Sequence, residues 1–78
     1  MDAVEVLARF DAQGKVTPLR FSWQGQEFEI ESTGRRWQAE DGLHILVMTP
    51  GGRMFELLLL ASEFRWYLSR VGQDRMLA

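Results

Sequence analysis

The chain has 78 residues and contains no cysteine, two prolines and one histidine. Without cysteine it can form neither a disulfide framework nor a thiolate metal site, and it has no thiol nucleophile. Zinc sites built from several imidazoles are excluded as well, because His44 is the only histidine. A short chain without disulfides is more typical of the cytoplasm than of secreted proteins, so we expect a cytoplasmic protein.

Long hydrophobic runs are also absent. The longest run, Leu57 to Ala61, is far shorter than the roughly 20 residues with which a helix crosses a bilayer. The N-terminal segment Met1 to Phe10 carries acids where an export signal needs bases. We therefore expect neither membrane insertion nor export.

Hydrophobic residues make up 46% of the chain and aromatic residues 12%, which is enough for one small folded domain. The net charge of −2 gives no general attraction for nucleic acid. Residues 1–34 hold three basic and six acidic residues, whereas residues 35–78 hold six and five. A surface that binds anions would therefore have to be local and built from arginine, which accounts for eight of the nine basic residues.

Alternation of apolar and polar side chains predicts strands through most of the chain. The first strand covers residues 4–10 and, after a turn over 11–15, the second covers 16–23, with Leu19, Phe21 and Trp23 facing inward. Pro18 lacks an N–H group for a strand ladder, so we expect an edge or a bulge there.

Gln24-Gly25 occupies the place of a two-residue hairpin turn, although glutamine resists positive φ. The third strand then runs from Gln26 to about Thr33, with Phe28 and Ile30 on one face. The acids Glu27, Glu29 and Glu31 lie on the other, solvated face. Arg20 is expected beside them across the hairpin.

Leu43 to Thr49 is apolar at nearly every position, which predicts a strand covered on both faces. Pro50-Gly51-Gly52 predicts the next hairpin turn. Two further strands follow, Arg53 to Leu60 and Phe64 to Val71, the second with Phe64, Trp66 and Leu68 inward. Apolar residues over 53–71 also recur at helical spacing, so one amphipathic helix over 53–71 is the alternative.

These elements predict an all-β (mainly β) domain over residues 1–71 and a frayed C-terminal tail over 72–78. Because the connections are short, we expect a single antiparallel sheet of about five to six strands in meander order. The sheet is expected to be strongly curved or to close into a small barrel. The helical alternative over 53–71 gives an α+β fold instead.

The residues of common active sites are missing or misplaced. We interpret His44 as an ordinary strand residue rather than a catalytic base, and the serines have no base beside them. Glu27, Glu29 and Glu31 spread over about 13 Å along a strand, too far apart to wrap one cation. Pro50 to Arg53 lacks the Lys-Ser/Thr pair of a phosphate loop. We expect no enzymatic activity, no cofactor and no metal site.

The aromatic residues divide into two groups. Trp23 and Trp66 alternate in phase with core residues and are expected to be buried. Trp37, in contrast, follows two arginines and precedes a polar stretch. The candidate binding residues are therefore Arg35, Arg36, Trp37, Arg65 and Tyr67, since arginines and aromatic rings together bind phosphates and bases. The alternative is that these arginines pair with Glu27, Glu29, Glu31 and Glu40, so that the patch neutralises itself.

Several motifs resemble those of a known family. They are Phe21-Ser22-Trp23-Gln24-Gly25-Gln26, Arg36-Trp37, Gly52-x-x-Phe55-Glu56-Leu57 and Trp66-Tyr67-Leu68-x-Arg70. Together they resemble a small uncharacterised bacterial domain that occurs alone. The pattern is also similar to the segment that ends ImuB-type proteins, inactive relatives of Y-family DNA polymerases that act in mutagenic repair. The resemblance covers most of residues 16–71.

This resemblance implies a partner in DNA repair or replication and supplies no catalytic residues. The chain differs from the family pattern at Phe55, where a tyrosine is usual, and in the leucine run after Glu56. We therefore expect a non-catalytic interaction module that binds a protein partner through an arginine–aromatic face or a free sheet edge. Binding of single-stranded nucleic acid through the same patch is the alternative. A free edge would also allow homodimerisation, because unpaired strand edges need a partner or a cover.

Overall fold

The structure, a computed structural model, describes residues 1–73, in which strands are joined by turns. The strands are β1 (Asp2–Ala3), β2 (Glu5–Phe10), β3 (Val16–Trp23), β4 (Gln26–Glu29), β5 (Ser32–Gln38), β6 (Gly42–Thr49), β7 (Arg53–Leu60) and β8 (Arg65–Gln73). The predicted all-β class is confirmed. The helical alternative over 53–71 is wrong, because β7 and β8 occupy that segment. Within the described residues, no helix is long and apolar enough to cross a membrane.

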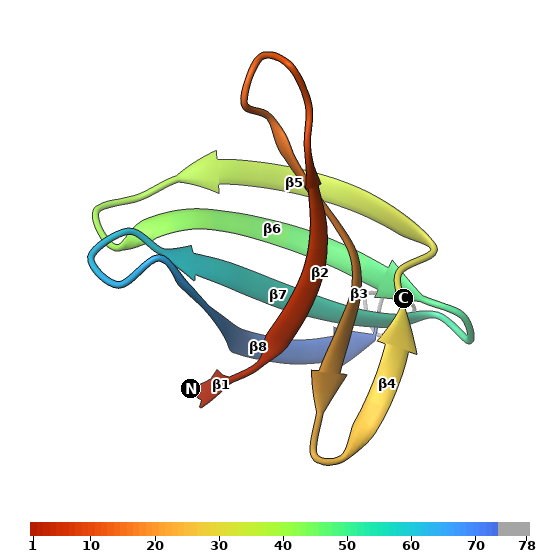
Figure 1. The fold of residues 1–78 in the computed structure, drawn as a ribbon. Helices are drawn as coiled ribbons and strands as arrows, with labels where there is room; N and C mark the ends of the chain where they lie inside the picture. Colours follow the sequence, from red (N-terminus) through yellow and green to blue (C-terminus); the bar gives the residue numbers. More distant parts are fainter. Residues whose placement is uncertain (74–78) are drawn as a thin grey trace.

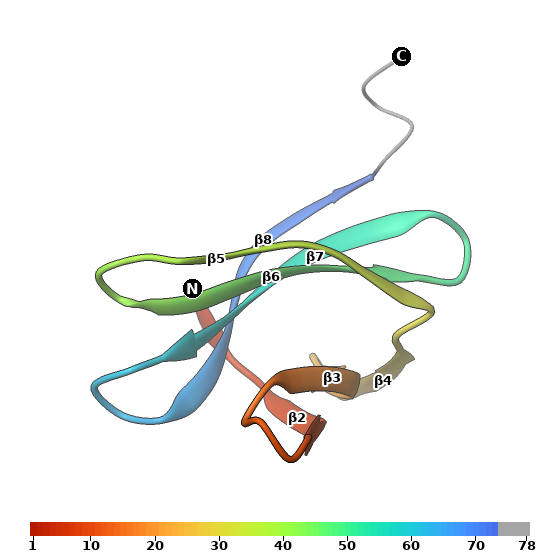
Figure 2. The same cartoon turned by 90° about the horizontal axis from the view of Figure 1, so that it is seen from above.

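The strands form two open antiparallel sheets. The larger sheet has the order β1-β8-β7-β6-β5 and the smaller the order β2-β3-β4. β2 and β3 run across the strands of the larger sheet at a steep angle (Figure 1). Figure 2 shows the smaller sheet against one side of the larger sheet only. The sequence predicts one sheet or a small barrel, whereas the structure divides its strands between two layers and closes neither of them.

β2 to β4 and β5 to β8 pair with their sequence neighbours, as predicted, but β1 pairs with β8, and the chain passes between the sheets twice. It leaves the larger sheet at Val4, whose N–H donates to the Trp66 carbonyl at 3.1 Å. It returns at Ile30 and Glu31. The N–H of Ile30 donates to Leu19 in the smaller sheet at 3.0 Å, and that of Glu31 to Met48 in the larger sheet at 2.7 Å. The single strand predicted over 26–33 is therefore two strands, β4 and β5, in different layers.

The short strand β1 ties the two sheets together. Asp2 and Ala3 lie opposite Leu68 and Tyr67 of β8. The Asp2 carboxylate also accepts a hydrogen bond, 2.9 Å long, from the indole N–H of Trp23 in β3. This contact joins the edge of the larger sheet to the smaller one.

A β-bulge interrupts β3 beside its proline. In the pairing with β2, Arg20 lies opposite Leu7 and Pro18 opposite Ala8, so Leu19 has no partner. The bulge predicted at Pro18 is thus confirmed. The inward orientation predicted for Leu19 is wrong, because the extra residue shifts the alternation and leaves Leu19 42% exposed.

The core lies between the two sheets and centres on aromatic rings. It contains Val16, Phe21, Phe28, Ile45, Val47, Phe55, Leu57 and Leu68. Phe55 of β7 reaches the smaller sheet, where its ring centroid lies 5.0 Å from that of Phe21 and 5.3 Å from that of Phe28. Trp23 and Trp66 pack against this core, as predicted.

The ends of β8 differ from the prediction. Phe64 is not a core residue: it lies in the β7–β8 turn at a φ of 54° and is 70% exposed. Because β8 begins at Arg65, Phe64 does not share the alternation that points Trp66 and Leu68 inward. At the other end β8 reaches Gln73, so two residues of the predicted tail belong to the strand. The rest of that prediction, over 74–78, lies outside the described residues.

The β3–β4 hairpin turns at Gln24 and Gly25, as predicted, with φ values of 53° and 74°. Two positive φ values in a two-residue turn are typical of type I′ geometry. We expect Gln24→Asn to raise the free energy of unfolding by about 0.5–1 kcal/mol, because asparagine tolerates positive φ better than glutamine. Urea denaturation measures the gain, with Gln26→Asn in β4 as the matched control. An unchanged or lower midpoint for Gln24→Asn contradicts this explanation of the turn.

Candidate interaction face and its histidine network

The larger sheet has an outer face, formed by the side chains of β5 to β8 that point away from the smaller sheet. Ile45, Val47 and Leu57 point into the core, so strand alternation places their neighbours on the outer face. This outer face consists of Arg35, Trp37, His44, Leu46, Met48, Met54, Glu56, Leu58, Leu60, Arg65, Tyr67, Ser69 and Arg70. None of the strands formed by residues 1–73 covers it (Figure 2).

A row of four cross-strand neighbours runs across the outer face from β5 to β8. Trp37 lies opposite His44, His44 opposite Leu58, and Leu58 opposite Tyr67. Because neighbouring strands are about 4.8 Å apart, the backbones of Trp37 and Tyr67 are separated by roughly 14 Å. The structure thus brings these two predicted aromatic residues to the same face, at opposite ends of one row.

An arginine lies over the aromatic ring at each end of this row. The guanidinium carbon of Arg35 is 4.9 Å from the ring centroid of Trp37, and that of Arg65 is 5.8 Å from the centroid of Tyr67. Arg65 also pairs with Glu63 at 3.6 Å, and the Tyr67 hydroxyl donates to the same carboxylate at 2.8 Å. This hydrogen bond raises the pKa of Tyr67. The charge of Arg65 is therefore neutralised by Glu63. This residue is not among the four glutamates that the sequence suggests as partners of the arginines.

Arg36 does not join the other four candidate residues. The register of β5 shifts at Gly34 and Arg35, and Arg36 then lies opposite the core residue Ile45. Its half-buried guanidinium donates a hydrogen bond to the Val16 carbonyl at 2.8 Å. Arg36 therefore connects the two sheets. Of the five candidate residues, four lie on the outer face: Arg35, Trp37, Arg65 and Tyr67.

A buried polar network lies at the centre of the outer face. His44 Nδ1 is 2.7 Å from Glu56 Oε2, and His44 Nε2 is 2.8 Å from Asp41 Oδ1 in the β5–β6 turn. The Ser69 hydroxyl donates to Glu56 at 3.2 Å, and Arg70 pairs with the other oxygen of Glu56 at 3.6 Å. A bulge in β8 leaves Ser69 without a partner in β7, which lets both side chains reach one carboxylate.

The geometry of this network fits a protonated histidine. A neutral imidazole carries one N–H, whereas both ring nitrogens of His44 lie within hydrogen-bonding distance of a carboxylate. Burial by itself would lower the pKa of His44, but the hydrogen bonds to Asp41 and Glu56 outweigh it and raise the pKa above its ordinary value of 6.5. The pKa of Asp41 is lowered, mainly by the hydrogen bond from His44.

This arrangement does not resemble a nucleophilic active site. Ser69 bonds to Glu56 and not to the imidazole, so His44 is not placed to take its proton. Both nitrogens of His44 are already engaged by carboxylates. In residues 1–73 no group of three or more His, Cys, Asp or Glu side chains is arranged to hold a metal ion. The network instead satisfies its own polar atoms: no buried side-chain N or O among the described residues lacks a partner.

The sequence interpretation of His44 as an ordinary strand residue missed this network. A signal was nevertheless present, because His44 and Glu56 each interrupt a run of apolar residues in the middle of a strand. A buried charge in such a strand needs a partner of opposite charge. The Pro50-Gly51-Gly52 turn places both residues on the same face of one hairpin, where His44 lies opposite Leu58 and Glu56 opposite Leu46.

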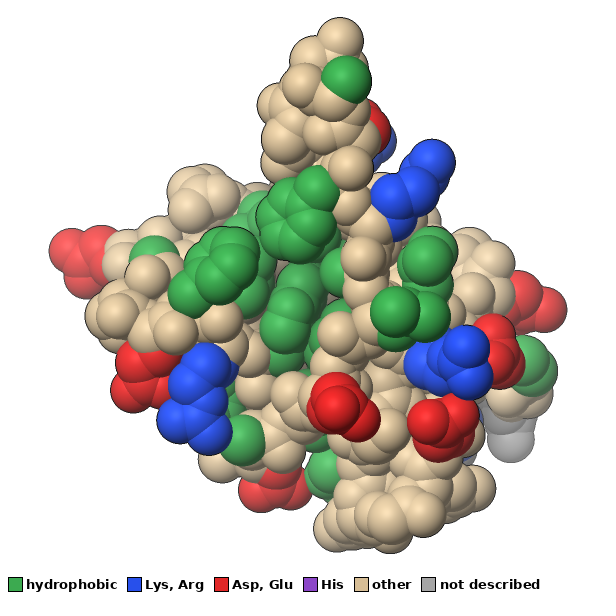
Figure 3. Space-filling model, in the orientation of Figure 1, with side chains coloured by type: hydrophobic (Ala, Val, Ile, Leu, Met, Phe, Trp, Pro, Cys, Tyr) green, Lys and Arg blue, Asp and Glu red, His purple; other side chains and the backbone are tan. Residues whose placement is uncertain are grey.

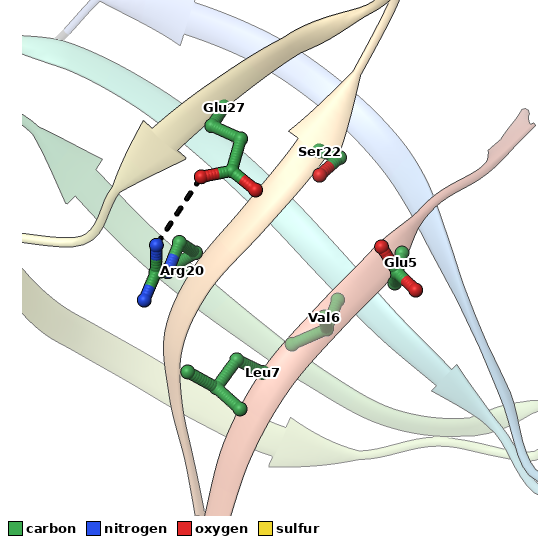
Figure 4. A pocket seen from close by; sticks show the side chains of 6 residues that line it. All are labelled: Glu5, Val6, Leu7, Arg20, Ser22 and Glu27. Carbon is green, nitrogen blue, oxygen red and sulfur yellow. Dashed lines mark hydrogen bonds and ion pairs between the residues drawn. The ribbon is translucent and has the colours of Figure 1, made fainter.

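Two other surfaces differ from the outer face in character. A shallow hollow over β2, β3 and β4 is lined by Glu5, Val6, Leu7, Arg20, Ser22 and Glu27 (Figure 4). Its arginine is already engaged, since Arg20 bonds to Glu27 at 3.2 Å, as the sequence predicts, and lies 3.7 Å from Glu29. Hydrophobic surface also gathers beside the β2–β3 hairpin (Figure 3). Phe10 at the end of β2 and Phe64 in the β7–β8 turn are both more than half exposed, and their ring centroids lie 6.4 Å apart.

No protein family, curated protein or solved structure matches the chain. The resemblance to the small bacterial domain and to ImuB-type proteins therefore stays a prediction from the sequence motifs. What the protein does has to be inferred from the geometry of its own surfaces.

Proposed function

We propose that this protein is a non-catalytic interaction module that binds a protein partner through the outer face of the larger sheet. The observation that carries the proposal is the apolar character of β6 and β7 on both faces. Strands of this kind are typical of sheets covered on both sides. The smaller sheet covers one face, and none of the strands of residues 1–73 packs on the second, where Leu58 is buried and its apolar neighbours are half-buried.

The side chains on the outer face fit a protein partner. Leu46, Met48, Met54 and Leu60 are half-buried there, on the same face as Trp37 and Tyr67. Methionine adapts its shape to a partner, and aromatic residues and arginine are enriched at protein interfaces. The polar atoms of the His44 network are already satisfied, so a partner could cover the centre of the face without leaving a buried charge unpaired.

The motif resemblance supports a partner in DNA repair or replication. The proposal also places the protein in the cytoplasm, because a short chain without cysteine is typical of that compartment, and gives it no cofactor. Homodimerisation through a sheet edge is a less favoured mode of association. At the β5 edge, Arg35 and Arg36 and the register shift beside them are devices that typically prevent edge-to-edge pairing.

Binding of single-stranded nucleic acid is the second proposal, and the outer face supports it less well. Trp37 already contacts two charged or polar groups, the ring of His44 and the guanidinium of Arg35, so a base would have to displace one of them to stack. Arg36 points inward and Arg65 pairs with Glu63. Among the candidate arginines, Arg65 alone forms an ion pair with a described carboxylate, so with Arg36 pointing inward only Arg35 is left to bind a phosphate.

The test compares lysine substitutions on the two sheets. Met48→Lys introduces a charge on the half-buried outer face and is expected to weaken partner capture about 30-fold, since loss of an interface hot spot costs about 2 kcal/mol. Leu7→Lys on β2, where Leu7 is 51% exposed, is the matched control and should bind like the wild type. Proteins captured from cell lysate are quantified for the wild type and both variants, after circular dichroism has verified that each variant folds.

Equal capture by both variants, or no specific capture by the wild type under gentle conditions, contradicts the proposal. A fluorescence titration with a single-stranded oligonucleotide at low salt tests the second proposal separately. Because the phosphate contribution is strongest at low salt, an unchanged tryptophan signal there eliminates nucleic-acid binding.

A further inference from the structure

We propose that His44 is a protonation switch on the outer face: loss of its proton breaks the hydrogen bond to the Asp41 side chain and weakens the stacking of Trp37 on the imidazole. The inference rests on the proposed function in one respect: if the outer face binds a partner, that binding should depend on pH. The switch itself belongs to the isolated protein. It follows from the placement of one imidazole between two carboxylates.

Only one of the two contacts of His44 survives deprotonation. A neutral ring can keep a hydrogen on Nδ1 for Glu56 or on Nε2 for Asp41, and the other nitrogen then presents a lone pair to a carboxylate. The Glu56 side chain is 8% exposed, so water cannot replace His44 as its hydrogen-bond partner. The Asp41 side chain is 48% exposed, so water can replace His44 there. Neutral His44 should therefore keep its bond to Glu56 and lose the bond to Asp41.

The remaining charges allow the fold to tolerate this change. Four described elements place titratable or charged groups against the network: Asp41 in the β5–β6 turn, Glu56 in β7, Arg70 in β8, and Arg35 in β5 through the Trp37 ring. Tyr67 lies in the same row but on the far side of Leu58. When His44 is neutral, Arg70 and the Ser69 hydroxyl still contact Glu56, so its buried charge keeps partners.

The backbone of the turn stays anchored while its side chain is released. The Asp41 carbonyl accepts a hydrogen bond from Ala61 at 2.9 Å, and Ala39 and Gly42 bond to each other in both directions. The change is therefore confined to side chains. It reaches Trp37 because the indole stacks on the His44 ring, with centroids 5.1 Å apart and planes 13° from parallel. An aromatic ring attracts an imidazolium more strongly than a neutral imidazole, so deprotonation loosens the stack.

The network is complete in a defined pH range. The pKa of His44 is raised, so its stabilisation is fully present below 6.5 and is lost as the pH rises through the raised value. The pKa of Asp41 is lowered, so its contribution is present above 3.8 and is lost as the pH falls through the lowered value. Between these limits the ring holds both carboxylates, and at higher pH the Asp41 contact opens first.

A pH titration of the protein alone tests the switch. The ring protons of His44 and the indole N–H of Trp37 are followed by NMR, which separates Trp37 from Trp23 and Trp66. We expect both signals to change with one common midpoint above pH 6.5. Asp41→Asn should lower that midpoint by about one pH unit, a tenfold loss of proton affinity, because it removes one negative charge next to the ring. Glu40→Asn, at the neighbouring position in the same turn, is the matched control and should leave it nearly unchanged.

A Trp37 signal that stays constant while His44 titrates overturns the switch, and so does a wild-type midpoint below 6.5 or an unchanged midpoint in Asp41→Asn. None of these measurements needs a partner. If the titration behaves as expected but partner capture does not depend on pH, the switch stands and its link to the proposed function fails.

Discussion

Phe55→Ala is expected to remove a large fraction of the free energy of unfolding. The Phe55 side chain is 1% exposed and contacts the rings of Phe21, Trp23 and Phe28, which belong to the other sheet. Truncation of a buried phenylalanine costs about 3–5 kcal/mol, and the total stability of a domain of this size is roughly 4–12 kcal/mol. The loss is severe here because the cavity would open at the point where the two sheets meet.

Urea denaturation followed by circular dichroism measures this loss. Phe64→Ala removes the same atoms from a ring that is 70% exposed, so it should change the free energy of unfolding by less than about 1 kcal/mol. Phe55→Leu keeps most of the apolar volume and should be intermediate. If Phe55→Ala and Phe64→Ala unfold at similar urea concentrations, the aromatic cluster does not hold the sheets together.

Gly42→Ala is the second substitution with a large expected effect, about 3 kcal/mol or more. A Cβ atom at Gly42 would lie 2.1 Å from the Leu59 carbonyl oxygen and 2.9 Å from the Ala61 nitrogen. Both are backbone atoms, so neither can move aside as a flexible side chain would. Relief of the overlap would require β6 and β7 to separate at the end of their ladder, where Gly42 pairs with Leu60.

Gly51→Ala is the control that separates this overlap from backbone strain. Gly51 also has a positive φ, 94°, but a Cβ there would meet no atom within 4 Å. It should therefore cost only about 1 kcal/mol. Thermal or urea unfolding of the two variants gives the difference directly. Similar losses for both would mean that the close approach of Gly42 to β7 is unimportant.

Local features of the fold could be predicted from the sequence, whereas the division into layers could not. The turns at Gln24-Gly25 and Pro50-Gly51-Gly52 depend on a few adjacent residues, and both occur where predicted. The passage between sheets at Ile30 and Glu31 depends on which distant strand accepts each N–H group. No local pattern marks that choice, so 26–33 is predicted as one strand.

The candidate site could be predicted only in part, for the same reason. The sequence predicts Trp37 and Tyr67 in one binding patch, and the structure places them on one face. Arg36 is predicted in the same patch because the predicted strand ends at about Thr33, so alternation is not applied to residues 35–37. In the structure they belong to β5, and alternation places Arg36 on the face opposite to Arg35 and Trp37.

Most residues that carry the family resemblance help to build the fold. Phe21, Phe55 and Leu57 belong to the core, and Gly25 supports the type I′ turn. Glu56 and Arg70 form part of the His44 network. The motifs therefore explain how the chain folds, and the partner in repair or replication that they imply has to be sought through the outer face.

The position of β1 has a consequence for synthesis of the protein. This strand pairs with β8 alone, so the backbone of residues 2–3 has no strand to pair with until residues 67–68 have been made. On the ribosome the N-terminal segment thus emerges first and docks last. Such long-range closure is slow compared with hairpin formation. A bulky tag fused directly before β1 should therefore delay the final step of folding more than one attached through a flexible linker.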